Sequence, residues 1–116
     1  MKRGDIVLVR FPFTDLSSSK LRPAVVIAPE NSCGDVILAF VSSVIRDTQD
    51  TDFVLSESDK DFSKSGLKKT SVFKMGKIAT LSKDAVYGRM GSVSPRLQKI
   101  LDEKLRRALW LRDLSK

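Results

Sequence analysis

The chain of 116 residues contains no histidine, a single cysteine and no long apolar run. Without histidine, the usual general acid or base and the usual triad base are missing, so any catalysis must use Arg, Lys, Ser, Thr, Tyr or carboxylates. Cys33 cannot form an internal disulfide, lies in a turn-type sequence and has no histidine to share a metal with, so we expect no metal and no cofactor. No apolar run approaches the ~20 residues of a membrane span, and no signal peptide precedes the first strand pattern. We therefore expect a cytoplasmic protein with no membrane partner.

The net charge of +7 is unevenly distributed along the chain. Residues 1–46 carry a net charge of +2, residues 47–61 carry −5 and residues 62–116 carry +10. A strongly basic second half indicates a polyanionic partner, and nucleic acid is the commonest one. Part of this charge equally fits the solvated face of a helix, and the acidic segment fits a solvated loop.

A hydrophobic content of 41% in 116 residues supports one core, so we predict a single domain over residues 1–116. Short apolar runs bounded by Gly, Pro, Ser or Asp predict strands at 6–11, 24–28, 36–41, 53–55, 71–75, 77–81 and 91–93. A polar loop is expected at 13–20, one capped helical turn at 82–88, and a bend or bulge at Gly76. Together these elements predict a mainly β fold, a strongly bent antiparallel sheet that closes toward a barrel.

The period changes after Ser94, which is a suitable N-cap followed by Pro95 at the first helical position. Apolar residues then recur at helical spacing, which predicts an amphipathic helix of about five turns packed on the sheet. Trp110 and Leu111 extend this stripe, and they fit either core packing or contact with a second subunit. The apolar positions are Leu97, Ile100, Leu101, Leu105, Ala108 and Leu109.

A basic turn, Lys20-Leu21-Arg22-Pro23, runs directly into the predicted strand 24–28. Pro23 fixes its own φ angle and favours an extended Arg22, so the guanidinium is held at the mouth of a strand. Arg presents a planar fork of donors that stays charged at physiological pH, which suits a phosphodiester. An ordinary solvated loop charge is the alternative.

Ser42 and Ser43 end the predicted strand 36–41. Hydroxyl groups at a strand end can donate to a phosphate or cap the backbone, and the sequence leaves both uses open. Further along, a basic turn and the bent strand bring four lysines within ten residues, Lys68, Lys69, Lys74 and Lys77.

Motifs along the whole chain resemble the MazF/PemK family of toxin endoribonucleases from type II toxin-antitoxin systems. The opening Gly-Asp-Ile-Val followed by the Arg-Pro-Ala-Val turn is the most specific of them. The matching segments are Gly4-Asp5-Ile6-Val7 with Phe11-Pro12, Lys20 to Val26, Val41-Ser42-Ser43, Gly66 to Lys69 with Ser71-Val72, and Leu105 to Leu109.

The resemblance implies a small SH3-like, CcdB-like barrel with a C-terminal helix, and a homodimer with an RNA groove at its interface. It also implies a sequence-selective mRNA interferase that cuts single-stranded RNA without a metal, and an acidic antitoxin as partner. Arg22 and Ser42 take the places of the catalytic pair. Some members carry an Arg and an Asp where this chain has Lys74 and Gly76, and glycine can transfer no proton. We expect RNA binding by Lys20, Ser43, Lys68, Lys69, Lys74 and Lys77.

Two other functions remain open at this stage. The same barrel serves a toxin that poisons DNA gyrase through a terminal aromatic residue, and Trp110 invites that comparison, although Arg22 would then have no role. A non-catalytic RNA-binding relative is the other, and Gly76 favours it. It predicts salt-dependent RNA binding without a product.

Overall fold

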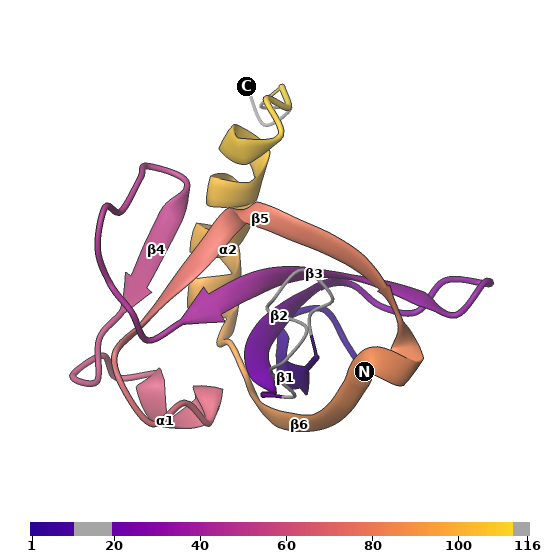
Figure 1. The fold of residues 1–116 in the computed structure, drawn as a ribbon. Coiled ribbons are helices and arrows are strands. Elements are labelled where there is room, and N and C mark those ends of the chain that lie inside the picture. The colour runs from indigo at the N-terminus through magenta and orange to yellow at the C-terminus, as the bar shows by residue number, and fades with distance from the viewer. Residues whose placement is uncertain (11–19, 113–116) are drawn as a thin grey trace.

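A computed structural model describes residues 1–10 and 20–112. The described residues form a six-stranded antiparallel sheet in the order β4-β5-β3-β2-β1-β6, with one long helix, α2 (Figure 1). The strands are β1 (Asp5–Val9), β2 (Arg22–Ala28), β3 (Asp35–Ser42), β4 (Asp52–Leu55), β5 (Ser71–Ser82) and β6 (Val86–Ser92). The mainly β fold class is thus confirmed. Residues 11–19 are outside the described residues. They include the end of the strand predicted at 6–11 and most of the loop expected at 13–20.

Both faces of strands β1, β2 and β3 carry buried side chains, which explains why these strands are apolar on both sides. Side chains alternate between the two faces of a strand. In β1, Ile6 therefore packs toward α2, whereas Val7 and Val9 pack inside the curled part of the sheet. Val25 on β2 joins the first cluster and Val26 joins the second. One sheet therefore supports two apolar clusters, one on each side.

The predicted bend at Gly76 is confirmed, and it lies inside one continuous strand of 12 residues. Ala39 of β3 pairs with Ile78, but the next residue, Phe40, pairs with Lys74. Residues 75–77 therefore have no partner on β3, and β5 bends at this bulge. Its first half pairs with β4 and its second half belongs to the curled part of the sheet (Figure 1).

The segment after β5 differs from the expected helical turn over 82–88. Only Lys83–Ala85 form a 3₁₀ turn, η1, and the side chain of Ser82 caps it by accepting from the backbone N–H of Asp84. The following β6 is longer than the strand expected at 91–93, because it begins at Val86. Two bulges in its pairing with β1 interrupt the alternation of side chains, so the sequence does not show the regular period of two that identifies a strand.

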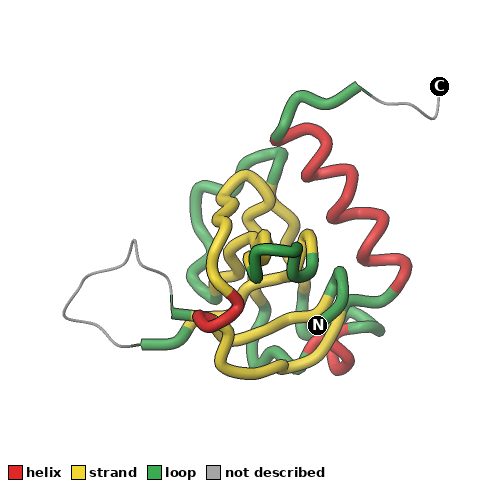
Figure 2. Tube along the Cα trace, turned by 90° about the vertical axis from the view of Figure 1, so that its right-hand side faces the viewer, coloured by secondary structure: helices red, strands yellow, loops and turns green. Residues whose placement is uncertain are grey.

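The C-terminal helix α2 (Pro95–Ala108) begins as predicted, with the Ser94 side chain accepting from the backbone N–H of Leu97. Leu97 and Leu101 are buried against the sheet, along one side of which the helix runs (Figure 2). The helix has 14 residues, about four turns rather than five. Its stripe does not continue, because Trp110 has a φ of +57° and is 94% exposed.

The sheet is not closed into a barrel by hydrogen bonds, because the described strands β4 and β6 are edges. A short helix that the sequence did not predict, α1 (Phe62–Ser65), lies against β6 instead (Figure 1). Gly66 follows α1 with a φ of +74°, and a Cβ there would overlap the carbonyl oxygen of Met90. A Cβ at Gly91 would overlap the backbone of α1. The two glycines thus permit the close approach of α1 and β6.

Candidate functional site

Arg22 and Ser42 lie at the same end of two neighbouring antiparallel strands. Ala24 of β2 is opposite Phe40 of β3. The pairing ends there, and extending its register by two residues gives Arg22 and Ser42 as the opposed positions. Opposed residues of an antiparallel pair project from the same face of the sheet, so the guanidinium and the hydroxyl share one side.

A cavity of about 310 Å³ opens at this end of the sheet. Both Arg22 and Ser42 line it. Four other predicted binding residues also line it: Lys20, Ser43, Lys68 and Lys69. Its apolar wall contains Pro23, Leu67 and Met90, which come from three different parts of the chain. The structure therefore brings six of the eight residues singled out from the sequence around one cavity.

The cations of this cavity are open to solvent. Arg22, Lys68 and Lys69 are exposed, and within residues 1–10 and 20–112 no carboxylate forms an ion pair with any of them. An unpaired guanidinium keeps all its donors available to an anionic group. Arg22 thus satisfies the first requirement of an anion site.

The hydroxyl of Ser42 has a defined orientation. Its Oγ accepts a hydrogen bond of 3.0 Å from the backbone N–H of Val44, so the capping use left open by the sequence is present. A hydroxyl has one proton to donate as well as two lone pairs, and accepting from Val44 does not consume the proton. Capping by Ser42 is therefore compatible with donation to a group bound beside Arg22.

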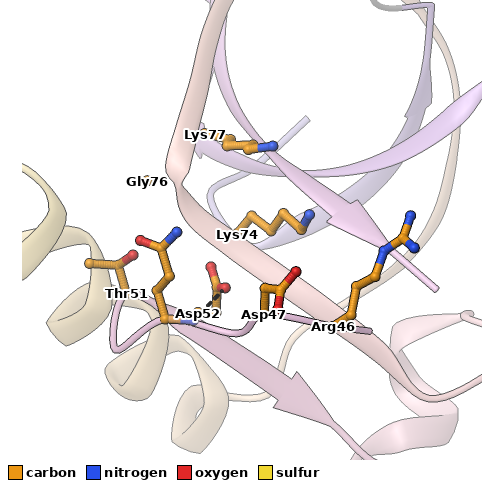
Figure 3. Close-up of a pocket in the computed structure, with 8 residues that line it drawn as sticks. Arg46, Asp47, Thr51, Asp52, Lys74, Gly76 and Lys77 are labelled. Carbon is orange, nitrogen blue, oxygen red and sulfur yellow. Dashed lines mark hydrogen bonds between the residues drawn. The ribbon is translucent and has the colours of Figure 1, made fainter. Parts of the chain in front are cut away.

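Lys74 and Lys77 line a different cavity of about 440 Å³, at the bulge of β5 (Figure 3). Arg46, Asp47 and Asp52 also line it. The nitrogen ends of the two lysines and of Arg46 project to the same side (Figure 3). Sequence reasoning missed Arg46, although it follows Ser42 and Ser43 closely along the chain. The four lysines that lie within ten residues of the sequence are therefore divided between two cavities, with Lys68 and Lys69 beside Arg22 and with Lys74 and Lys77 at the bulge.

The acidic segment is more than a solvated loop, because it fixes the start of α2. Arg96 contacts Asp59 at 2.5 Å and Asp61 at 3.1 Å. Ser94 Oγ donates to Asp61 at 2.7 Å. The hydrogen bond from Ser94 is the main cause of the lowered pKa of Asp61, and the backbone N–H of Asp61 is the main cause of the lowered pKa of Asp59. No local pattern predicts this cluster, since its members lie about 35 residues apart.

Neither a metal site nor a membrane span is found in the part of the chain that the structure describes. Within residues 1–10 and 20–112, no three side chains of the His, Cys, Asp or Glu type gather as a metal site would require. No helix in these ranges is long and apolar enough to cross a bilayer.

The fold and the open cationic cavity define a small β domain suited to binding a polyanion. The comparison with protein families gives a more specific assignment. The family model of PemK-like, MazF-like toxins of type II toxin-antitoxin systems matches residues 2–109. The chain therefore belongs to this toxin family. The comparison with curated protein sequences gave no match.

Solved structures of such toxins share the fold. An endoribonuclease in complex with its cognate antitoxin from a Mycobacterial species is similar with a TM-score of 0.71 and 23% identity, over 97% of this chain and 98% of that one. Mycobacterium tuberculosis toxin MazF-mt6 gives a TM-score of 0.73 and 17% identity, over 94% and 99% of the two chains. MazF from Deinococcus radiodurans gives 0.73 and 16%, over 96% and 97%.

Proposed function

We propose that this protein is the endoribonuclease toxin of a type II toxin-antitoxin system, and that it cuts single-stranded RNA, chiefly mRNA, in a sequence-selective and metal-independent manner. One observation carries the proposal: Arg22 and Ser42 line a single cavity, and the guanidinium has no ion-pair partner among the described residues. Membership of the toxin family and the fold shared with an endoribonuclease support it.

The proposed reaction is attack by an RNA 2′-hydroxyl on the adjacent phosphorus. The oxygen–phosphorus bond that forms gives a 2′,3′-cyclic phosphate, and the bond to the 5′-oxygen breaks to give a free 5′-hydroxyl. The proton leaving the 2′-hydroxyl balances the proton that the 5′-oxygen gains. Arg22 stabilises the charge that develops on the phosphoryl oxygens, and Ser42 donates a hydrogen bond to the same group.

The remaining cations hold the strand on either side of the reacting phosphate. Lys20, Lys68 and Lys69, with the hydroxyl of Ser43, border the same cavity as Arg22. Lys74 and Lys77 border the cavity at the bulge of β5 and bind the strand further away. Phosphate contacts of this kind supply affinity but no sequence information.

We further propose a homodimer in the cytoplasm, where mRNA is present, and an acidic antitoxin as partner. The exposed apolar residues Leu109, Trp110 and Leu111 support contact with a second subunit. The complex of a similar endoribonuclease with its cognate antitoxin supports the second partner. An acidic segment of the antitoxin would cover the cations around Arg22, because complementary charge speeds encounter and blocks RNA directly.

The test is incubation of the purified protein with a long single-stranded RNA in EDTA, followed by mapping of the new ends. We expect cleavage at a limited set of sequences with cyclic phosphate and 5′-hydroxyl ends. Arg22→Ala should lower the rate by about 100- to 1,000-fold, the usual loss for one donor to a developing negative charge.

Lys99→Ala is the matched control, since Lys99 is an exposed cation on α2 that does not line the cavity. It should cleave like the wild type. Absence of cleavage by the wild type, or equal cleavage by Arg22→Ala, would refute the proposed function.

A further inference from the structure

Tyr87 is an exposed aromatic residue at an irregular point of an edge strand. Leu8 of β1 pairs with Gly88 of β6, and the next residue, Val9, pairs with Val86. Tyr87 is therefore the extra residue of a β-bulge, and its side chain is 56% exposed. Bulges turn a side chain away from its regular direction and are frequent beside binding sites.

One arginine contacts this aromatic ring, and a second lines the same cavity. The guanidinium carbon of Arg10 lies 5.1 Å from the centroid of the Tyr87 ring, within the range of a cation–π contact. Arg89, two residues along β6, has Nε 3.3 Å from Oδ1 of Asp5, whose side chain is 9% exposed. The Arg89 side chain is 58% exposed, so Asp5 anchors one side of its guanidinium and leaves the rest in solvent.

The ring and Arg89 line a cavity of about 250 Å³. Gly88, between them, has no heavy atom within 4 Å of the position that a Cβ would take, so the space beside the ring is open. The cavity is small for a complete ligand, but a flat group that stacks on one ring needs less room.

The start of β6, where Val86 and Tyr87 line this cavity, lies at the end of the sheet that carries Arg22, and the cavity extends from there along β1 toward Asp5. Val9 pairs with Arg22 on one side and with Val86 on the other. Neighbouring strands are ~4.8 Å apart, so the start of β6 lies about 10 Å from the start of β2. A strand of RNA with one phosphate at Arg22 would therefore pass within reach of Tyr87.

We propose that Tyr87 stacks on a base of the bound RNA, close to the phosphate at Arg22, with Arg10 and Arg89 beside it; this inference rests on the proposed function. Arg10 occupies one face of the ring and the base takes the other. Single-stranded RNA is commonly bound by such stacking because every base has a π-face. The free donors of Arg89 face the edge of the base, which favours guanine with its two acceptors O6 and N7.

The test is the binding of a fluorescently labelled RNA whose 2′-hydroxyls are methylated, so that binding is measured without cleavage. Tyr87→Ala should weaken binding by about 10-fold, the expected loss for one stacked base, whereas Tyr87→Phe should bind like the wild type. Lys99→Ala is the control, because it changes an exposed residue of α2 that lines none of the cavities described above, and it should leave the RNA affinity unchanged.

A second measurement uses the fact that the chain has one tyrosine and one tryptophan. In the Trp110→Phe variant, Tyr87 is the sole tyrosine or tryptophan fluorophore, and stacking of a base should quench its emission as RNA is added. Guanine-containing oligonucleotides should quench more than those without guanine, and Arg89→Ala should remove this preference.

The outcomes separate the two proposals. Unchanged RNA affinity of Tyr87→Ala together with unquenched Tyr87 emission, in a protein that cleaves RNA through Arg22, would overturn the stacking site alone. Weakened binding that Tyr87→Phe does not restore would also overturn it, because phenylalanine keeps the stacking face. Failure of the wild type to bind any RNA would overturn the stacking site and the proposed function together.

Discussion

The arginines of helix α2 and the cations of the Arg22 cavity have the same charge but different surroundings. On α2, Arg96 is held by Asp59 and Asp61, and Arg106 and Arg107 both contact Glu103. Around the cavity, Arg22, Lys68 and Lys69 have no carboxylate partner among the residues that the structure describes.

The difference shows why net charge alone does not locate a binding site. Residues 62–116 carry a net charge of +10, yet the helical arginines in this half are engaged in intramolecular pairs. Glu103 accepts hydrogen bonds from both Arg106 and Arg107, and its pKa is lowered to about 2, mainly by the hydrogen bond from Arg106. An unpaired cation can meet a phosphate without first leaving a carboxylate, so the cavity is the better site for a polyanion.

The largest effect should come from a charge-conserving change in each group. Arg22→Lys keeps the charge but loses the planar fork, so we expect RNA cleavage to fall by about 10- to 100-fold with an unchanged melting temperature. Arg96→Lys should lower the melting temperature and leave RNA cleavage unchanged, because it loosens the contact with Asp59 and Asp61 and leaves the cavity intact. Cleavage rates and thermal melts of both variants check this, and similar effects of the two on cleavage would remove the distinction between the groups.

A smaller effect is expected from the lysines of the cavity. The double variant Lys68→Ala/Lys69→Ala should bind single-stranded RNA more weakly, and the slope of log Kd against log salt should fall by about 1.4, because each lost phosphate contact contributes ~0.7. The double variant Arg106→Ala/Arg107→Ala removes the same charge from α2. It should leave the slope unchanged. An equal decrease of the slope in both double variants would show that RNA binding depends on the total charge of the protein and not on the cations of the cavity.

The smallest effect concerns the pairing on α2 itself. The pKa of Glu103 falls from 4.5 to about 2 in the folded protein, so the ionised carboxylate stabilises the fold above pH 4.5 and this contribution is lost as the pH falls toward 2. Glu103→Gln should lower the melting temperature slightly at pH 7, since the carboxylate is 42% exposed. Thermal melts should show the difference from the wild type shrinking below pH 4.5, and a difference that stays constant with pH would contradict this account.

The regular parts of the fold could be predicted from the sequence because their signals are local. Apolar runs marked the first three strands, and Ser94 with Pro95 marked the start of α2. Of the capped helical turn expected over 82–88, Lys83–Ala85 with the Ser82 cap are present, but residues 86–88 are a strand, because the bulge at Tyr87 breaks the period of two that identifies one. Helix α1 is four residues long and carries too little periodicity to be found.

The placement of Arg22 and Ser42 at one cavity could be predicted from the sequence, because it depends only on where two neighbouring strands end. Arg22 begins one strand and Ser42 ends its neighbour, so an antiparallel pairing was enough to bring them together. The positions of Lys74 and Lys77 depend on which residues of β5 have no partner, and only the pairing register shows that. The clamp of Asp61 on Arg96 joins distant segments and leaves no local signal.

The paired glycines between α1 and β6 have a bearing on the site although neither carries a side chain. Gly66 immediately precedes Leu67, Lys68 and Lys69, and Gly91 immediately follows Met90, so the close approach of the two segments helps to position four residues that line the cavity. A single methyl group added at either glycine would overlap the facing backbone and displace the residues next to it. Substitutions of Gly66 or Gly91 are therefore expected to impair the proposed activity, although neither residue lines the cavity.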